Sequence, residues 1–299
     1  MAMNRASFAK MLEPGLNTLF GLEYDSYPSE YEAVFSSNTS QKAYEEDVLL
    51  AGFGAAPTKN EGASVSYDDA GQQWTARYQH ETVALAFSIT EEAEEDGQYG
   101  SIASRYTKAL ARSMSSTKEI KAANVLNNAT SVNGGDGTTL LSTAHPTQNG
   151  NQSNTLATAA DLSETSLESI LIQISDMKDE RGLRVAAQGT QLIIPTAYTF
   201  VAERLLESQL RTGTADNDIN AIKSGGYLPK GYHVMRRLTD ADQFFVQTDV
   251  PDGLKYFTRS AMKKGMEGDF ETGNIRYKCR ERYSFGFTDW RGIFGSEGA

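Results

Sequence analysis

The sequence predicts a fold of the α+β class. Residues 101–129 repeat apolar side chains at helical spacing. Residues 83–89 and 274–287 instead alternate with the two-residue period of β-strands. We therefore expect one long helix and several strands within the same chain.

The composition narrows the class of protein. The chain has 299 residues, enough for one large domain or two modest ones that bury a core without cross-links. Its single cysteine, Cys279, excludes a disulfide framework and a zinc site built from a Cys/His cluster. No apolar run reaches the length of about 18 residues that indicates a membrane span, and residues 1–10 lack the apolar segment of a signal peptide. We expect a soluble, acidic protein of the reducing cytoplasm, or of an assembly made there.

Charge is distributed unevenly along the chain, whose net charge is -11. Residues 21–99 hold sixteen acidic and three basic side chains, whereas residues 254–299 hold nine basic and six acidic ones. A sequence-specific DNA-binding domain is normally basic and carries a recognisable motif, and neither holds here. The acidic segment 21–99 and the basic segment 254–299 could attract each other within a chain or between copies. The alternative is that both are ordinary solvated surface.

The first 42 residues predict an extended arm with one short helix. Their apolar stripe is weak and is interrupted at Pro14-Gly15. An arm with exposed phenylalanine and leucine side chains, such as Phe8 and Leu12, is expected to lie on another surface.

A polar β-hairpin is predicted next. Residues 63–67 and 74–78 alternate with period two on either side of a turn at residues 68–72. The hairpin is too polar to be buried on both faces, and an isolated hairpin is only marginally stable in water. It therefore needs support from this subunit or from another.

The long helix over residues 101–129 would extend roughly 43 Å, with a break allowed near Ser115-Ser116. A glycine-rich loop over residues 127–154 follows, and then a helix that begins with a capping pattern at residues 163–166. The remaining elements are a strand at 191–195, a helix at 197–208, a polar loop at 217–226, and strands at 231–237, 244–248, 256–257, 266–270 and 274–287.

The sequence offers little catalytic or ligand-binding chemistry. It contains no Walker loop, full dinucleotide fingerprint, HExxH or GxSxG motif. The loop at 134–137 could hold an anion through its backbone N–H groups, although a flexible loop explains it as well. The acidic clusters at 45–47 and 91–96 could hold a hard cation but lack the spacing of a ligand loop. We expect no metal and no cofactor.

A hydrolase is the competing interpretation. It would need one of His80, His145 and His233 to meet a nucleophile and an acid, which the spacing alone does not exclude. Cys279 lies among basic residues that could lower its pKa, but on an alternating strand it is more simply a small buried residue. We expect no enzymatic activity.

Three segments carry a resemblance to a known family. They are LLSTAHP at 140–146, LIIPTAYTF at 192–200 and the arginine-rich, then aromatic, stretch at 276–292. Taken with the order arm, hairpin, long helix, glycine-rich loop and mixed α/β part, they resemble the major capsid proteins of tailed bacteriophages, and the Mu-like major head subunits in particular. The resemblance covers nearly the whole chain and implies the Hong Kong 97-type fold.

This resemblance implies a division of the chain. Residues 1–43 would be an N-terminal arm and residues 44–89 an extended hairpin called the E-loop. Residues 90–184 would form the peripheral domain with its spine helix, residues 185–258 the axial domain, and residues 259–299 the return strand of the peripheral domain and the C-terminus.

The resemblance also implies a function. The protein would be a structural component of the virion that assembles in the host bacterial cytoplasm, as pentamers and hexamers, into an icosahedral bacteriophage head around double-stranded DNA. Its partners would be many copies of itself, portal, scaffold or protease proteins, in some cases a decoration protein, and DNA contacted without sequence specificity, but no membrane. Because the arm begins almost at residue 1, scaffold and protease would be separate proteins, or a leading segment has been removed.

Contacts between subunits are expected at seven residues of the arm and the E-loop: Phe8, Leu12, Lys59, Val65, Tyr67, Trp74 and Tyr78. Some relatives join an E-loop lysine covalently to a neighbour, and Lys59 is the only lysine of this loop. Replacing Trp74 and Tyr78 by alanine is expected to leave a soluble monomer that assembles poorly. An encapsulin-like shell that does not enclose DNA is the alternative within the same fold.

Overall fold

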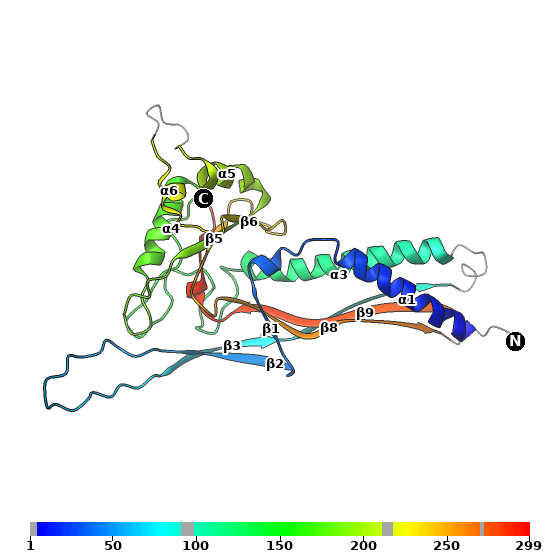
Figure 1. The fold of residues 1–299 in the computed structure, drawn as a ribbon, viewed down its shortest axis with the longest axis horizontal. Helices are drawn as coiled ribbons and strands as arrows, with labels where there is room; N and C mark the ends of the chain where they lie inside the picture. The colour runs from blue at the N-terminus through cyan, green and yellow to red at the C-terminus, as the bar shows by residue number, and fades with distance from the viewer. Residues whose placement is uncertain (1–4, 91–98, 211–217, 270–271) are drawn as a thin grey trace.

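The computed structural model describes residues 5–90, 99–210, 218–269 and 272–299. The described elements form two four-stranded sheets, helices packed on each sheet, and a separate two-stranded hairpin (Figure 1). The acidic cluster at 91–96, considered above as a cation site, lies outside the described residues.

The first sheet has the strand order β1-β8-β9-β4. Its strands are β1 (Ser36–Thr39), β4 (Glu81–Ile89), β8 (Leu254–Gly268) and β9 (Ile275–Phe287). β1 runs parallel to β8, and the other pairs are antiparallel. The strands predicted at 83–89 and 274–287 are confirmed.

Two strands predicted at 256–257 and 266–270 are in fact parts of the single strand β8. The register with β9 shifts between Thr258 and Lys263, so the chain bulges there without leaving the sheet. These shifts interrupt the alternation of side chains and make one strand look like two in the sequence. The short parallel strand β1 was not predicted.

Two helices lie on one face of this sheet, α1 (Arg5–Tyr24) and α3 (Tyr99–Asn127) (Figure 1). The prediction of the long helix is confirmed, and α3 passes Ser115-Ser116 without a break. The helix expected in the arm is longer than predicted, because α1 is a 20-residue helix with Pro14 inside it. Leu16 and Phe20 of α1 are buried with α3, and this packing outweighs the cost of an internal proline.

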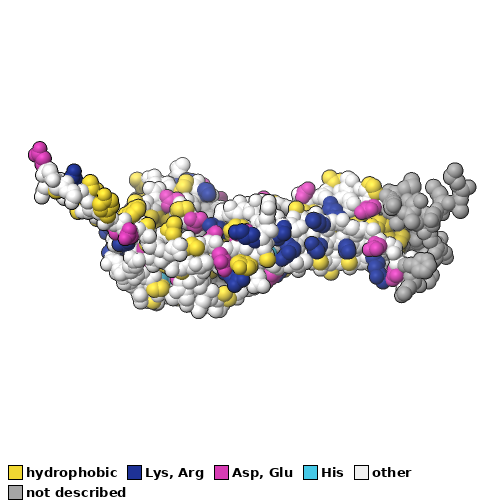
Figure 2. All heavy atoms as spheres, turned by 90° about the horizontal axis from the view of Figure 1, so that it is seen from below, with side chains coloured by type: hydrophobic (Ala, Val, Ile, Leu, Met, Phe, Trp, Pro, Cys, Tyr) yellow, Lys and Arg dark blue, Asp and Glu magenta, His cyan; other side chains and the backbone are white. Residues whose placement is uncertain are grey.

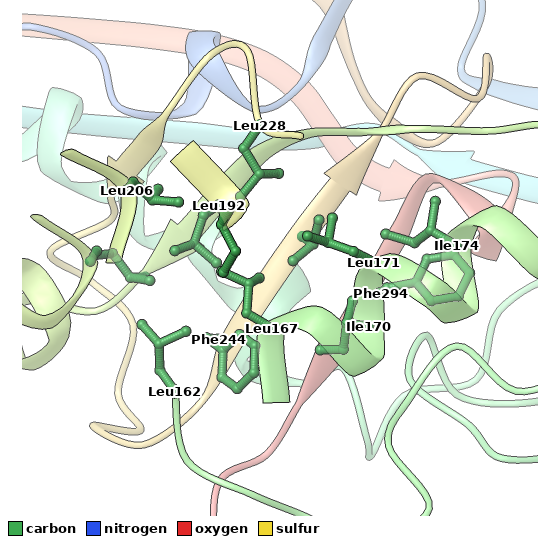
Figure 3. Close-up of a cluster of buried hydrophobic side chains, with 14 of the residues drawn as sticks. Leu162, Leu167, Ile170, Leu171, Ile174, Leu192, Leu206, Leu228, Phe244 and Phe294 are labelled. Carbon is green, nitrogen blue, oxygen red and sulfur yellow. The ribbon is translucent and has the colours of Figure 1, made fainter. Parts of the chain in front are cut away.

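The second sheet has the strand order β10-β7-β5-β6. Its strands are β5 (Gly189–Ile194), β6 (Tyr232–Val234), β7 (Phe244–Thr248) and β10 (Ile293–Ser296), and its helices are α4 (Glu164–Asp176), α5 (Thr199–Glu207) and α6 (Ala221–Gly225). The side chains of α4, including Leu167, Ile170 and Ile174, meet Leu192 and Phe244 of the sheet in one apolar cluster (Figure 3). The end of the chain therefore returns to this sheet through β10, which the sequence did not predict.

Local sequence explains the ends of these helices. Ser163 and Ser166 cap each other's backbone N–H groups at the start of α4, which confirms the predicted capping pattern. The polar loop predicted at 217–226 contains α6, whose first turn is capped by the Asn220 side chain. No helix in the described part of the chain is long and apolar enough to cross a membrane.

Candidate assembly site at the hairpin

The hairpin consists of β2 (Tyr44–Leu50) and β3 (Gln72–Gln79), joined by the long loop 51–71. Figure 1 shows this loop reaching away from both sheets and their helices. The prediction of a hairpin is confirmed, but residues 63–67 are not its first strand. β2 takes that place because its acidic residues find partners: Glu46 pairs with Arg77 of β3, and Asp47 with Lys255 of β8.

The loop carries side chains that nothing in the subunit covers. Tyr67 is 96% exposed and Val65 is 63% exposed, and Lys59 is exposed as well. Leu50 and Phe53, which were not among the predicted contact residues, are also more than half exposed. Apolar side chains gathered on one exposed segment are typical of a surface that another protein covers.

Trp74 and Tyr78 lie at the base of the hairpin and face their own subunit. Tyr78 is only 3% exposed and packs against the ring of Phe257 in β8. The indole Nε1–H of Trp74 donates a hydrogen bond to the carbonyl oxygen of Thr288 at 3.1 Å. Contact of Trp74 with a neighbour stays a prediction, whereas Tyr78 has almost no surface to offer one. The expected effect of replacing both by alanine therefore changes from lost assembly to a less stable subunit.

A chain of polar contacts holds the hairpin base. The Tyr78 hydroxyl lies 2.6 Å from the Thr288 hydroxyl, which donates to the carboxylate of Asp47 at 3.2 Å. The amine of Lys255 contacts the carboxylates of both Asp47 and Asp252 at 2.6 Å. Burial alone would lower the pKa of Lys255, but hydrogen bonds and charge from these two carboxylates raise it above its ordinary value. The contacts tie both hairpin strands to β8 and to the turn after β9.

The glycine-rich loop closes against the other side of the base. A Cβ atom on Gly135 would stand 2.9 Å from the carbonyl oxygen of Thr75 and from the Trp74 ring, so only glycine fits without displacing the hairpin. The next residue, Asp136, binds the Nδ1 atom of His145 at 2.6 Å. This loop is thus a fitted part of the hairpin base.

His145 is the centre of a buried polar cluster. Its ring stacks on Trp290 with centroids 4.2 Å apart, and its Nε2 atom faces the side-chain oxygen of Asn154 at 3.1 Å. That oxygen also accepts the backbone N–H of Ser142, so His145 donates to it. Burial would raise the pKa of Asp136, but hydrogen bonds from His145 and Thr138 hold it below its ordinary value. Both ring nitrogens are engaged with acceptors, and neither is placed to activate a nucleophile.

Two other candidates for catalysis, His80 and Cys279, are also buried within the fold. The ring of His80 contacts the hydroxyls of Ser40 and Ser284, and thereby joins the residue after β1 to β9. Burial raises the pKa of the Cys279 thiol to about 11, which opposes reactivity. In the described ranges, no three His, Cys, Asp or Glu residues come together as metal ligands. Phe8 and Leu12 lie on α1, but their side chains are outside the described part.

A family described as phage capsid protein matches residues 72–295, which is most of the chain. The chain belongs to this family of phage capsid proteins. No curated protein sequence matches it.

Solved structures show the fold of this capsid protein. The capsid of Myoviridae phage XM1 is 8% identical with a TM-score of 0.54, over 89% of this chain and 90% of the other. Mycobacterium phage Adephagia is 11% identical with a TM-score of 0.54, over 91% of each chain. A virus-like particle from Pyrococcus furiosus is 11% identical with a TM-score of 0.53, over 95% of this chain and 98% of the other. The capsid protein therefore has the Hong Kong 97-type α+β fold, and the resemblance to tailed-phage major capsid proteins is confirmed.

Proposed function

We propose that this capsid protein assembles as pentamers and hexamers into an icosahedral shell that encloses double-stranded DNA, and that the hairpin loop reaches onto a neighbouring subunit. The observation that carries the proposal is the exposed loop 51–71, with Val65 and Tyr67 uncovered while the hairpin base is locked to its own subunit. Because the hairpin base is bonded to its own subunit, the direction in which the exposed loop 51–71 leaves the subunit is fixed at the base. Such a tip is useful to an assembly and has no use in a catalytic site.

We also propose a division of the chain into an arm, an E-loop, a peripheral domain and an axial domain. Residues 1–43 would be the arm and residues 44–89 the E-loop, and each adds one strand, β1 and β4, to the first sheet. The peripheral domain would consist of α3 with β8 and β9 of that sheet. Because α4 and β10 pack with the second sheet, we assign both to the axial domain together with the part of 185–258 that precedes β8. Assembly would take place in the host cytoplasm, with a portal and with scaffold, protease or decoration proteins as partners, and without enzymatic activity of its own.

The negative charge of the chain is consistent with enclosing DNA. A strongly basic inner wall would bind phosphates tightly through counterion release and hold the genome on the shell. A chain with a net charge of -11 is consistent with a wall that is not strongly basic. The similarity to a virus-like particle favours one alternative, a shell of the same fold that encloses no DNA.

A pair of variants tests the proposal. Replacing Val65 and Tyr67 together by serine should leave the subunit folded and reduce the yield of assembled particles, because both side chains are exposed on the loop. The matched control replaces Ile172 and Phe200 by serine, since these are 63% and 76% exposed on α4 and α5. Particle yield is measured by light scattering and negative-stain microscopy. Equal yields for both pairs would contradict the role of the loop.

The content of the particles tests the DNA proposal separately. Particles formed in the natural host are treated with nuclease, and the nucleic acid they protect is extracted. Protected double-stranded DNA is the expected result. Shells that protect none would support the alternative.

A further inference from the structure

The uncovered face of the first sheet carries a row of basic side chains. Along β9, every second residue, such as Tyr277 and Cys279, is buried against α1 and α3. The residues between them point to the opposite face, where Figure 2 shows Lys and Arg side chains gathered over β8 and β9. We call this set the basic row: Lys263, Arg276, Lys278, Arg280 and Arg282.

Most of the row lacks acidic neighbours on its own face. The register places Lys278 between Gly265 and Ala86, two neutral residues. It places Arg280 directly opposite Lys263, and like charges opposite each other destabilise a sheet.

Only one end of the row has a carboxylate partner within the described residues. Arg276 pairs with Asp269 at 2.5 Å and lies opposite Glu267. At the other end, Arg282 has a buried Nε atom with no hydrogen-bond partner in the described part. The row is therefore a surface that an acidic partner would complete.

The sequence contains a matching acidic segment. Several acidic side chains of the hairpin and arm are already paired within the subunit, as in Asp47 with Lys255 and Glu30 with Arg236. The densest acidic stretch is the run Glu91–Asp96, which has five carboxylates in six residues. Its extended length of about 20 Å equals the distance spanned by Arg276 to Arg282 along a strand, also about 20 Å.

We propose that the basic row binds the Glu91–Asp96 run of a second copy of the chain. This inference rests on the proposed function, since it names which surfaces meet when subunits assemble. The contact joins two different surfaces, so it is heterologous and can close a ring of subunits. It would also cover these basic side chains, most of which are otherwise exposed on the described subunit.

The connection that contains the run is too short to follow the whole row of its own chain. β4 ends at Ile89 beside the Arg276 end of the row, and α3 begins at Tyr99 on the covered face at the same end of the sheet (Figure 1). The connection from Ile89 to Tyr99 spans at most about 35 Å. A path along the row to Arg282 and back would need at least about 40 Å, before crossing the edge of the sheet.

Cross-linking tests the pairing directly. Isotope-labelled and unlabelled subunits are mixed before assembly and treated with a carbodiimide, which joins lysine amines to nearby carboxylates. We expect peptides in which Lys263 or Lys278 of one copy is joined to the 91–96 run of another, with one labelled and one unlabelled partner. Shells that form without such peptides, or with cross-links inside one copy only, would overturn this proposal and leave the proposed function standing. Absence of any oligomer would overturn both.

Charge reversal provides the second test. Lys278→Glu with Arg280→Glu should lower particle yield at least about tenfold, because like charges would then face each other. Glu92→Lys with Glu94→Lys should do the same, and combining all four changes in one chain should restore assembly. The control reverses two exposed lysines elsewhere, Lys108→Glu with Lys230→Glu, and should assemble normally. If the row variant assembles normally but its particles retain less DNA, the row binds nucleic acid and the proposal is wrong.

Discussion

The hydroxyl of Tyr78 in β3 lies 2.6 Å from the hydroxyl of Thr288, just beyond β9. Because the Thr288 hydroxyl donates onward to Asp47 in β2, one short chain of hydrogen bonds connects both hairpin strands to the first sheet. Burial raises the pKa of Tyr78 far above its ordinary value, so its proton stays in place as the first donor of this chain. The direction of an otherwise exposed loop is therefore set at its base.

Removing this first donor tests the role of the base. Tyr78→Phe should lower the free energy of unfolding by about 1 kcal/mol, the usual value for one buried hydrogen bond. Particle assembly should persist, because Tyr78 exposes only 3% of its surface. Denaturant unfolding measures the first effect, and Tyr67→Phe, on the exposed loop, is the control without loss. An unchanged midpoint for Tyr78→Phe would show that the contact does not hold the hairpin.

The fit of Gly135 against the hairpin leads to a second prediction. Gly135→Ala should destabilise the protein by about 1–3 kcal/mol, because the new methyl group overlaps Thr75 and Trp74 and the hairpin base must shift. Gly71→Ala, where a Cβ meets nothing within 4 Å, should change stability by less than about 0.5 kcal/mol. Thermal unfolding of the two variants decides the point, and equal stability would contradict the close fit.

The Asp136–His145 pair predicts a dependence on pH. Since the folded protein holds the pKa of Asp136 below its unfolded value of about 3.9, its contribution is complete above pH 4 or so and is lost as the pH falls further. Asp136→Asn should therefore cost about 3 kcal/mol at neutral pH, and less as the pH falls below about 4. Urea unfolding at several pH values measures this, with the exposed Asp25→Asn as control. A cost that stays constant down to pH 3 or so would contradict the assignment.

Lys118 of α3 ties the spine helix to the first sheet. Its amine lies 3.6 Å from the Glu281 carboxylate and between 5.1 and 5.5 Å from the ring centres of Tyr31, Tyr256 and Tyr283. Burial by itself would lower the pKa of Lys118, but Glu281 and the nearby tyrosines raise it above its ordinary value, so the amine is charged.

Lys118→Met should therefore cost about 3–5 kcal/mol, because it leaves Glu281 buried without its cation. Adding Glu281→Gln should recover part of that loss. Denaturant unfolding of the single and double variants measures both effects. A double variant that is less stable than Lys118→Met alone would argue against the ion pair as the cause.

The sequence predicted those elements that depend on residues close together in the chain. The periodicity of α3, the cap at Ser163 and the alternation of β9 each depend on near neighbours, and each was predicted correctly. The errors arose where distant packing decides. Pro14 suggested an interrupted arm, but burial of Phe20 against α3 keeps α1 intact.

Part of the assembly site could also be predicted from local sequence. The polar hairpin pattern indicated a segment that its own subunit does not cover, and Val65 and Tyr67 are indeed exposed there. The role of Tyr78 does not, because its partner Thr288 is more than two hundred residues away. β2 was not predicted as the first strand of the hairpin for the same reason. Its Asp47 forms an ion pair with Lys255 of β8, which is also about two hundred residues away.

Assembly into a shell is tested most directly by the mass and shape of the purified protein, measured by light scattering and negative-stain microscopy at low and high salt. We expect closed shells, or rings of five or six subunits, built from the 32.7 kDa chain. Monomers or dimers under every condition, including after addition of the other head proteins, would contradict it.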